Sequence, residues 1–220
     1  TLFPAQEWMT RVGRLAFPIF AFMIAEGCYY TSNVKKYMLR LFLFAIISEI
    51  PFNLIMGSSV FYPFHQNVLW TFLLGVLSIQ IIEKAKKKQK KWISFFVVCL
   101  VLLMDFLLGT ITMVDYNAAG ILTVLLFYFF RKKTWISFAA QLVGLYYLNV
   151  VMLGNLYYPV TILGHHFEIA QQSFALLALI PIWLYHGEQG YHNKWFKYFC
   201  YAFYPVHLLI LVVIWQWRIR

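Results

Sequence analysis

The chain has 220 residues, of which 62% are hydrophobic and only 12% are charged. Soluble domains contain roughly 45–50% apolar residues, and a mean hydropathy of +0.70 also separates this chain from them. The composition excludes an ordinary soluble enzyme and predicts an all-α, polytopic membrane bundle with one domain over residues 1–220. The net charge of +10 is explained by basic loops at a membrane surface, so it does not imply nucleic-acid binding.

Apolar segments long enough to cross a bilayer, about 17–25 residues, recur along the chain. The sequence predicts eight of them and shows no internal repeat. The fifth is the weakest, because Asp115 and Asn117 crowd its start. The predicted spans are residues 12–30, 37–56, 67–83, 92–109, 112–130, 134–152, 168–186 and 198–217.

Lysine and arginine are distributed unevenly between the loops. Fourteen of the 18 lie in four alternate connections, whereas the loops near 57–66, 110–116 and 153–167 contain none. Cytoplasmic loops of membrane proteins carry the excess of basic residues. We therefore predict that the lysine-rich loop at 84–91 lies in the cytoplasm against anionic membrane lipid, and that both ends of residues 1–220 lie outside.

Ionisable residues inside apolar segments are the first functional candidates, because a charge in a bilayer is costly unless it faces a partner or a cavity. Arg14 and Glu26 lie at opposite ends of the first span, roughly 18 Å apart on an ideal helix, so each needs a partner on another helix. Glu26 is either a functional carboxylate or the partner of Arg40. Glu49, in the second span, has Arg14 at the same depth as its expected partner.

Two histidines are candidate bases. His65 begins the third span beside Gln66 and Asn67, and an imidazole with an ordinary pKa of about 6.5 suits general-base catalysis. The alternative is a loop residue next to a helix cap, for which Asn67 is well suited. His207 lies in an apolar run, where it is either a structural bridge or a catalytic base.

A third polar group precedes the fifth span. Asp115, Tyr116 and Asn117 could orient a substrate amine or hydroxyl, or could form a turn and cap. His165 and His166 do not predict a metal site. Adjacent histidines point in different directions, and no third ligand has helical spacing to them.

Five stretches in order along the chain resemble the TraX family. They are GRLAFPIFAFMIAEG (13–27), LRLFLFAIISEIPFNL (39–54), HQNVLWTFLLG (65–75), DYNAAGIL (115–122) and YPVHLLIL (204–211). The named member of that family N-acetylates conjugative pilin, and the family is similar to the multi-pass membrane acyltransferases. The family's motif positions are occupied here by Arg14, Glu26, Arg40, Glu49, His65, Gln66, Asn67, Asp115, Tyr116 and His207.

The resemblance implies an acetyltransferase in a bacterial cytoplasmic membrane, with acetyl-CoA or another acyl-CoA as co-substrate and no metal. The acceptor would be an amine or hydroxyl of a peptide, pilin-like protein or glycan at the outer face. Family members usually begin with one more membrane helix that ends in an Asp-His pair. That pair has no counterpart in residues 1–220. Either the protein lacks this helix, which would put acyl transfer in doubt, or, as we expect, a ninth span precedes Thr1 and the true N-terminus lies in the cytoplasm. In related acyltransferases a histidine on the first helix is the favoured base.

In this interpretation a histidine or carboxylate deprotonates the acceptor, and Arg14 or Asn67 stabilises the thioester oxyanion. Two alternatives stay open: a small-molecule or lipid transporter, and a non-enzymatic assembly factor for a surface structure. The paired inverted segments common in transporters are not visible in the sequence. The candidate catalytic residues are His65, Glu26 and His207, and the candidate substrate-binding residues are Arg14, Arg40, Glu49, Gln66, Asn67, Asp115, Tyr116 and Asn117.

Overall fold

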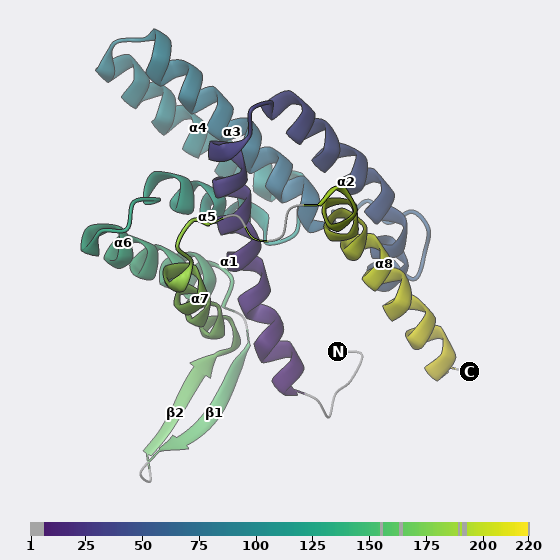
Figure 1. Ribbon diagram of the computed structural model, residues 1–220. Coiled ribbons are helices and arrows are strands. Elements are labelled where there is room, and N and C mark those ends of the chain that lie inside the picture. Colours follow the sequence, from purple (N-terminus) through teal and green to yellow (C-terminus); the bar gives the residue numbers. More distant parts are fainter. Residues whose placement is uncertain (1–6, 155, 163–164, 189, 191–192, 220) are drawn as a thin grey trace.

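The computed structural model describes residues 7–154, 156–162, 165–188, 190 and 193–219. It is a bundle of helices with one β-hairpin projecting from it (Figure 1). In chain order the elements are α1 (Glu7–Tyr30), α2 (Val34–Gly57), α3 (Val68–Lys88), α4 (Lys91–Ile111), α5 (Asn117–Phe129), α6 (Trp135–Leu145), the π-helix η1 (Tyr146–Met152), β1 (Tyr157–Ile162), β2 (His165–Ala170), the 3-10 helix η2 (Gln171–Ala178), α7 (Leu179–Leu184) and α8 (Lys194–Ile219).

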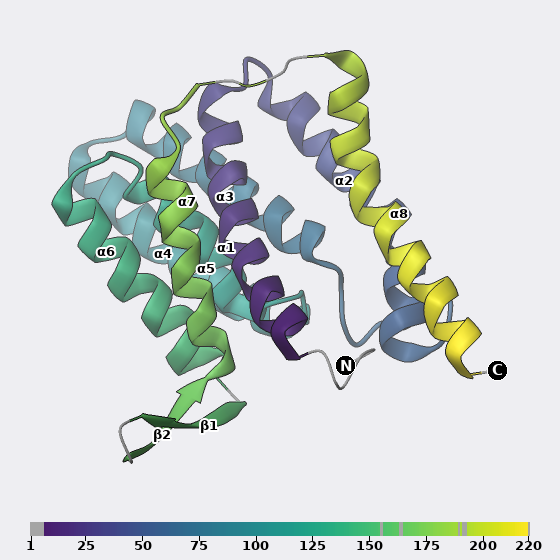
Figure 2. The same cartoon turned by 60° about the horizontal axis from the view of Figure 1, so that its bottom comes forward.

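Successive helices run in alternating directions, so their connections gather at two ends of the bundle (Figure 2). The end that carries the β-hairpin and the start of α1 is called here the hairpin end. The opposite end carries the connections after α1, α3 and α5, and is called the basic end. The basic loops that the sequence predicts to be cytoplasmic thus gather at one end.

Six helices among the described residues are long and apolar enough to cross a membrane. The helical membrane bundle is therefore confirmed, but the predicted number of eight spans is not. The segments predicted at 112–130 and 168–186 contain only shorter helices, Asn117–Phe129 and Gln171–Leu184. The six longer helices are Thr10–Tyr30, Val34–Gly57, Val68–Lys88, Lys91–Ile111, Trp135–Met152 and Tyr198–Trp217.

The short helix α5 forms the centre of the core. It packs against α1, α3, α4 and α6, and its side chains Ile121, Val124 and Phe127 are fully buried. Because other helices surround α5, it does not need the length of a lipid-exposed span. Gly75 of α3 and Gly109 of α4 face Val124 and Ala118 at close range, so the two outer helices approach α5 closely.

Large apolar side chains cover the outside of the bundle. On α4, Phe95 and Phe96 are each at least 70% exposed, and Trp217 at the end of α8 is 85% exposed. Soluble monomers rarely expose apolar patches of more than a few hundred Å². The exposed surface therefore matches helices that face lipid.

The loop predicted near 153–167 contains a β-strand, so the chain is not purely α-helical. Strands β1 and β2 pair antiparallel, with Tyr157 opposite Ala170. The segment YYPVTI is rich in aromatic and β-branched residues, which favour strands over helices. The expectation that His165 and His166 do not form a metal site stays untested, because the side chain of His165 lies outside the described residues.

The contact of α4 with α5 leads to a prediction for Gly109→Ala. A Cβ atom at Gly109 would lie 2.6 Å from Cα of Ala118 and 2.7 Å from its nitrogen, which are both backbone atoms. The helices must separate to admit it, so we expect a loss of about 1–3 kcal/mol in unfolding free energy. Reversible unfolding in mixed micelles measures it. The matched control is Gly13→Ala, where a Cβ has nothing within 4 Å; equal stability of the two variants would contradict the packing.

Candidate functional site

Backbone hydrogen bonds join the loop before α3 to the loop before α5. Gln66 N donates to Met113 O at 3.0 Å, and Asp115 N donates to Gln66 O at 2.9 Å. The Thr71 hydroxyl donates to the Asp115 carbonyl oxygen at 2.6 Å. These bonds place His65 beside Asp115, a residue 50 positions further along the chain.

His65 and Asp115 form a hydrogen-bonded pair at the hairpin end. His65 Nε2 lies 3.4 Å from Asp115 Oδ1, and the imidazole stacks on Phe52 with ring centroids 5.5 Å apart. A carboxylate can only accept, so Nε2 carries the proton and Nδ1 is the basic atom of the neutral ring. The hydrogen bond to Asp115 raises the pKa of His65 above its ordinary value, against a lowering by burial.

Tyr116 connects this pair to α1. Its backbone lies in the left-handed region at φ 63°, and its ring stacks on Phe17 with centroids 3.8 Å apart. The guanidinium of Arg14 lies beside the phenol and donates to Gln171 Oε1 at 3.4 Å. The expected pairing of Arg14 with Glu49 is therefore wrong. Asn117 is exposed, and its N–H donates to Val114 O in the turn that begins α5.

Glu49, Asn67 and Trp70 join α2 to α3. Asn67 is fully buried; its Nδ2 donates to Glu49 Oε2 and, at 2.9 Å, to Ala45 O, while its Oδ1 caps α3 by accepting from Leu69 N. Trp70 Nε1 donates to the same Glu49 oxygen at 2.9 Å. Both amide atoms of Asn67 are thus engaged in hydrogen bonds that hold α2 and α3 together, and this contact is called here the Asn67 clamp. Neighbouring Gln66 bonds Pro63 O within its own loop.

A cavity of about 400 Å³ extends from this site toward the basic end. Asp115 and Tyr116 line its polar end, and helix α8 closes one side with Tyr204 and His207. The remaining wall is apolar and aromatic. It is formed by Gly13, Ala16, Phe17, Phe20, Ile24, Leu41, Phe44, Val68, Leu69, Phe72, Cys200, Tyr201 and Phe203.

Two predicted residues on the cavity wall or next to it have defined partners. His207 Nδ1 lies 3.1 Å from Phe203 O. Because a carbonyl oxygen can only accept, Nδ1 carries the proton and donates, and Nε2 is the acceptor atom of the neutral ring. Arg40 Nε donates to the hydroxyl of Tyr201 at 3.1 Å. The structure thus places His65, Asp115, Tyr116 and His207 around one region, with Arg40 toward its basic end.

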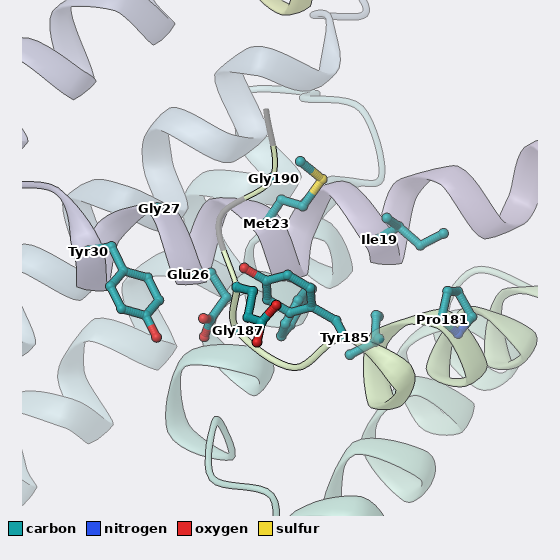
Figure 3. Close-up of a pocket in the computed structure, with 12 residues that line it drawn as sticks. Ile19, Met23, Glu26, Gly27, Tyr30, Pro181, Tyr185, Gly187 and Gly190 are labelled. Carbon is teal, nitrogen blue, oxygen red and sulfur yellow. The ribbon is translucent and has the colours of Figure 1, made fainter. Parts of the chain in front are cut away.

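Glu26 lies elsewhere. Its carboxylate pairs with both Nε and Nη2 of Arg131, whose guanidinium carbon stands 3.5 Å from the ring centroid of Tyr29. The expected pairing of Glu26 with Arg40 is therefore wrong. Glu26 lines a second cavity near the basic end, between α1 and α7 (Figure 3), so it cannot act on the same atoms as His65.

Sequence reasoning missed several polar contacts. Arg131 looked like one more basic loop residue, which concealed its role as the partner of Glu26. Trp70, three residues after Asn67, could have been noticed as an indole donor near a buried carboxylate. Asp105 had the clearest signal, as a lone carboxylate in an apolar run; it is buried and accepts from the Ser78 hydroxyl at 2.6 Å.

Fold and site together define a multi-pass helical membrane protein with a His–Asp pair beside an apolar cavity. The chain belongs to the TraX family, described as "TraX protein", whose sequence model matches residues 2–215. It is also similar to the "Probable fimbrial assembly protein FimC, serogroup H1" of Dichelobacter nodosus, with 26% identity over 213 residues, covering 93% of this chain and 82% of that protein. No solved structure matches the chain.

The clamp at Asn67 can be tested against its neighbour. Asn67→Ala removes a helix cap, worth about 0.5–2 kcal/mol, and leaves buried oxygens of Glu49 and Ala45 short of a donor, at about 1–3 kcal/mol. We expect a clear loss of unfolding free energy in mixed micelles. Gln66→Ala loses only one exposed loop hydrogen bond and should stay close to wild type. Similar stability of the two variants would show that Asn67 does not hold the helices together.

Proposed function

We propose that this chain serves the assembly of a bacterial surface filament by transferring an acyl group to an acceptor at the hairpin end. In the simplest case the group is acetyl, taken from acetyl-CoA, and the acceptor is an amine or hydroxyl of a pilin-like subunit. The observation that carries the proposal is the His65–Asp115 pair, whose carboxylate also lines the cavity. A base oriented by a carboxylate is the arrangement that activates a nucleophile for acyl transfer.

His65 supplies the base in this mechanism. Its Nδ1 takes the proton of the acceptor as the acceptor nitrogen or oxygen bonds to the thioester carbonyl carbon. Asp115 fixes the tautomer through Nε2 and stabilises the imidazolium that forms. The C–S bond breaks, and the imidazolium returns its proton to the departing thiolate. Arg14, beside Tyr116, is the donor that stabilises the oxyanion. Asn67 is not assigned this role, because its amide is already bonded to Glu49 and Ala45.

The cavity supports a donor that enters from the basic end. Its walls are apolar along the faces of α1 and α8, which suits a slim thioester arm. At that end Arg40 bonds Tyr201, and Lys35 and Lys36 lie in the first turn of α2. These cations suit the phosphates of an acyl-CoA, while the carbonyl of the donor reaches toward Asp115.

A second function, a non-enzymatic assembly factor, is favoured by the printed description of the relative, which refers to fimbrial assembly. In that case the polar residues at the hairpin end would hold a subunit without reacting with it. Acyl transfer releases free CoA thiol, and subunit binding does not. Incubation of the purified protein with acetyl-CoA and an acceptor peptide therefore separates the two functions.

The base assignment predicts the behaviour of His65→Gln. Glutamine keeps hydrogen bonding to Asp115 but is not basic, so CoA release should fall by about 100-fold to 10,000-fold while the protein stays folded. The measurement is thiol release in detergent, with monodispersity as the folding check. Ser59→Ala, an exposed position in the same α2–α3 loop that loses one exposed hydrogen bond, is the control and should keep its activity. Near-normal turnover by His65→Gln would exclude His65 as the base and transfer the role to His207.

The raised pKa of His65 predicts a pH dependence of activity. A base must be neutral, so the rate should rise with pH and reach half its maximum above about pH 6.5, the ordinary histidine value. Asp115→Asn should move that midpoint down toward about 6.5. Stability should change in the opposite direction: the protonated His65 bond to Asp115 contributes fully below about pH 6.5, and its contribution is lost as the pH rises through the folded-state pKa. A midpoint unchanged by Asp115→Asn would contradict the coupling.

A further inference from the structure

The cavity between α1 and α7 is separate from the His65–Asp115 site. Its volume is about 760 Å³, within the range of roughly 300–1,000 Å³ that ligand pockets span. In Figure 3, Tyr30, Glu26 and Tyr185 gather at one end of the cavity, and Ile19 and Pro181 lie at the other. Helix α1 lines both cavities with different residues.

The lining has an apolar body and an acidic, aromatic mouth. Ile19, Phe22, Met23, Pro181 and Ile182 form the body. The polar side chains of the mouth are Glu26, Tyr30, Tyr185 and Glu188. None of the described lining residues is basic, although the chain carries 18 Lys and Arg against 8 Asp and Glu. Two of those eight acids line this cavity.

The nearby cations hold the walls of the cavity and do not line it. Arg131 pairs with Glu26 and stands over the rings of Tyr29 and Tyr30. Lys133 Nζ donates to the carbonyl oxygens of Trp183 and Tyr185, at the end of α7. The exposed carboxylate of Glu188 therefore faces the mouth without a basic residue among the described lining.

The mouth also presents aromatic rings. Tyr185 and Phe22 meet edge to face, with centroids 5.9 Å apart, and Tyr30 lines the same end. Ring faces and carboxylates both attract ammonium groups. Glu26 is already neutralised by Arg131, so Glu188 is the lining carboxylate that would attract a cation and repel a phosphate or carboxylate ligand. The lining thus favours a cation over the anionic acyl donor of the proposed reaction.

We propose that the α1–α7 cavity binds an organic ammonium ion attached to an apolar group. The ammonium lies at the mouth between Glu188, Tyr30 and Tyr185, and the apolar part extends along Ile19, Met23 and Pro181. This chemistry is present in a free alkylamine at the basic end and in the headgroup of an aminophospholipid. Binding at this cavity does not depend on acyl transfer at His65.

The test uses the whole chain in phosphatidylglycerol nanodiscs, whose lipid carries no ammonium group, and follows the thermal unfolding midpoint as octylammonium is added. Octanol and octanoate are parallel probes with the same number of carbon atoms and no positive charge. We expect a saturable rise in the midpoint with octylammonium alone. In Glu188→Gln the apparent Kd should weaken by about fivefold, and in Glu168→Gln, an exposed carboxylate on the β-hairpin, it should not change. Glu26 is left intact, because its loss would leave Arg131 unpaired.

A second arm distinguishes the two sources. If the lipid headgroup occupies the cavity, nanodiscs that contain phosphatidylethanolamine should raise the midpoint of the wild type and reduce the further effect of octylammonium, and both changes should be smaller in Glu188→Gln. If a free amine is the ligand, the lipid should have no effect and octylammonium should act equally in both membranes. Equal midpoint shifts with octanol, octanoate and octylammonium, or an unchanged Kd in Glu188→Gln, would overturn the proposal.

Discussion

The backbone bridge between Gln66 and the 113–115 loop is the interaction on which the hairpin end depends. It joins two connections that lie about 50 residues apart and sets where α3 and α5 begin. A bilayer offers few hydrogen bonds to loop backbone, so loops at its edge must satisfy their own polar groups. The bridge does this with two N–H donors, and the Thr71 hydroxyl adds a third. The same backbone bridge places His65 beside Asp115.

Charge is distributed in two separate regions because α1 carries its polar residues at its two ends. Near the hairpin end Arg14 lies beside Tyr116, and near the basic end Glu26 pairs with Arg131. The apolar middle of the helix keeps the two regions from interacting. One helix can therefore belong to two cavities of opposite character, one reaching the histidine pair and the other lined by carboxylates.

Hydropathy predicted the long helices well, because burial in lipid imposes a length and a composition that are visible in any apolar run. It did not predict the shorter helix α5, which other helices surround, or the 3-10 helix and short α-helix at η2–α7. The β-hairpin was missed because its strands lie in a stretch that hydropathy marks only as a loop. Both failures concern packing between segments, which a single sequence does not encode locally.

The candidate site was predicted as a set of residues but not as a set of contacts. His65, Asp115 and Tyr116 were chosen for their chemistry and do lie together. The partners of Arg14, Glu26 and Glu49 were wrong, since depth along a helix does not say which helix is adjacent. Glu49 accepts hydrogen bonds from Asn67 and Trp70, at the start of the neighbouring helix α3. Which residues pair depends on which helices are adjacent, and this is known only from the fold.

The backbone of Tyr116 lies in the left-handed region, which is unfavourable for a residue other than glycine. A non-glycine residue at φ 63° costs about 1–3 kcal/mol and persists only where its surroundings impose it. Here the ring stacked on Phe17 supplies that restraint, and Tyr116 N in turn bonds Asp115 Oδ1 at 3.1 Å. The direction of the Asp115 carboxylate therefore depends on how Tyr116 packs against α1, which couples the His65–Asp115 pair to the position of that helix.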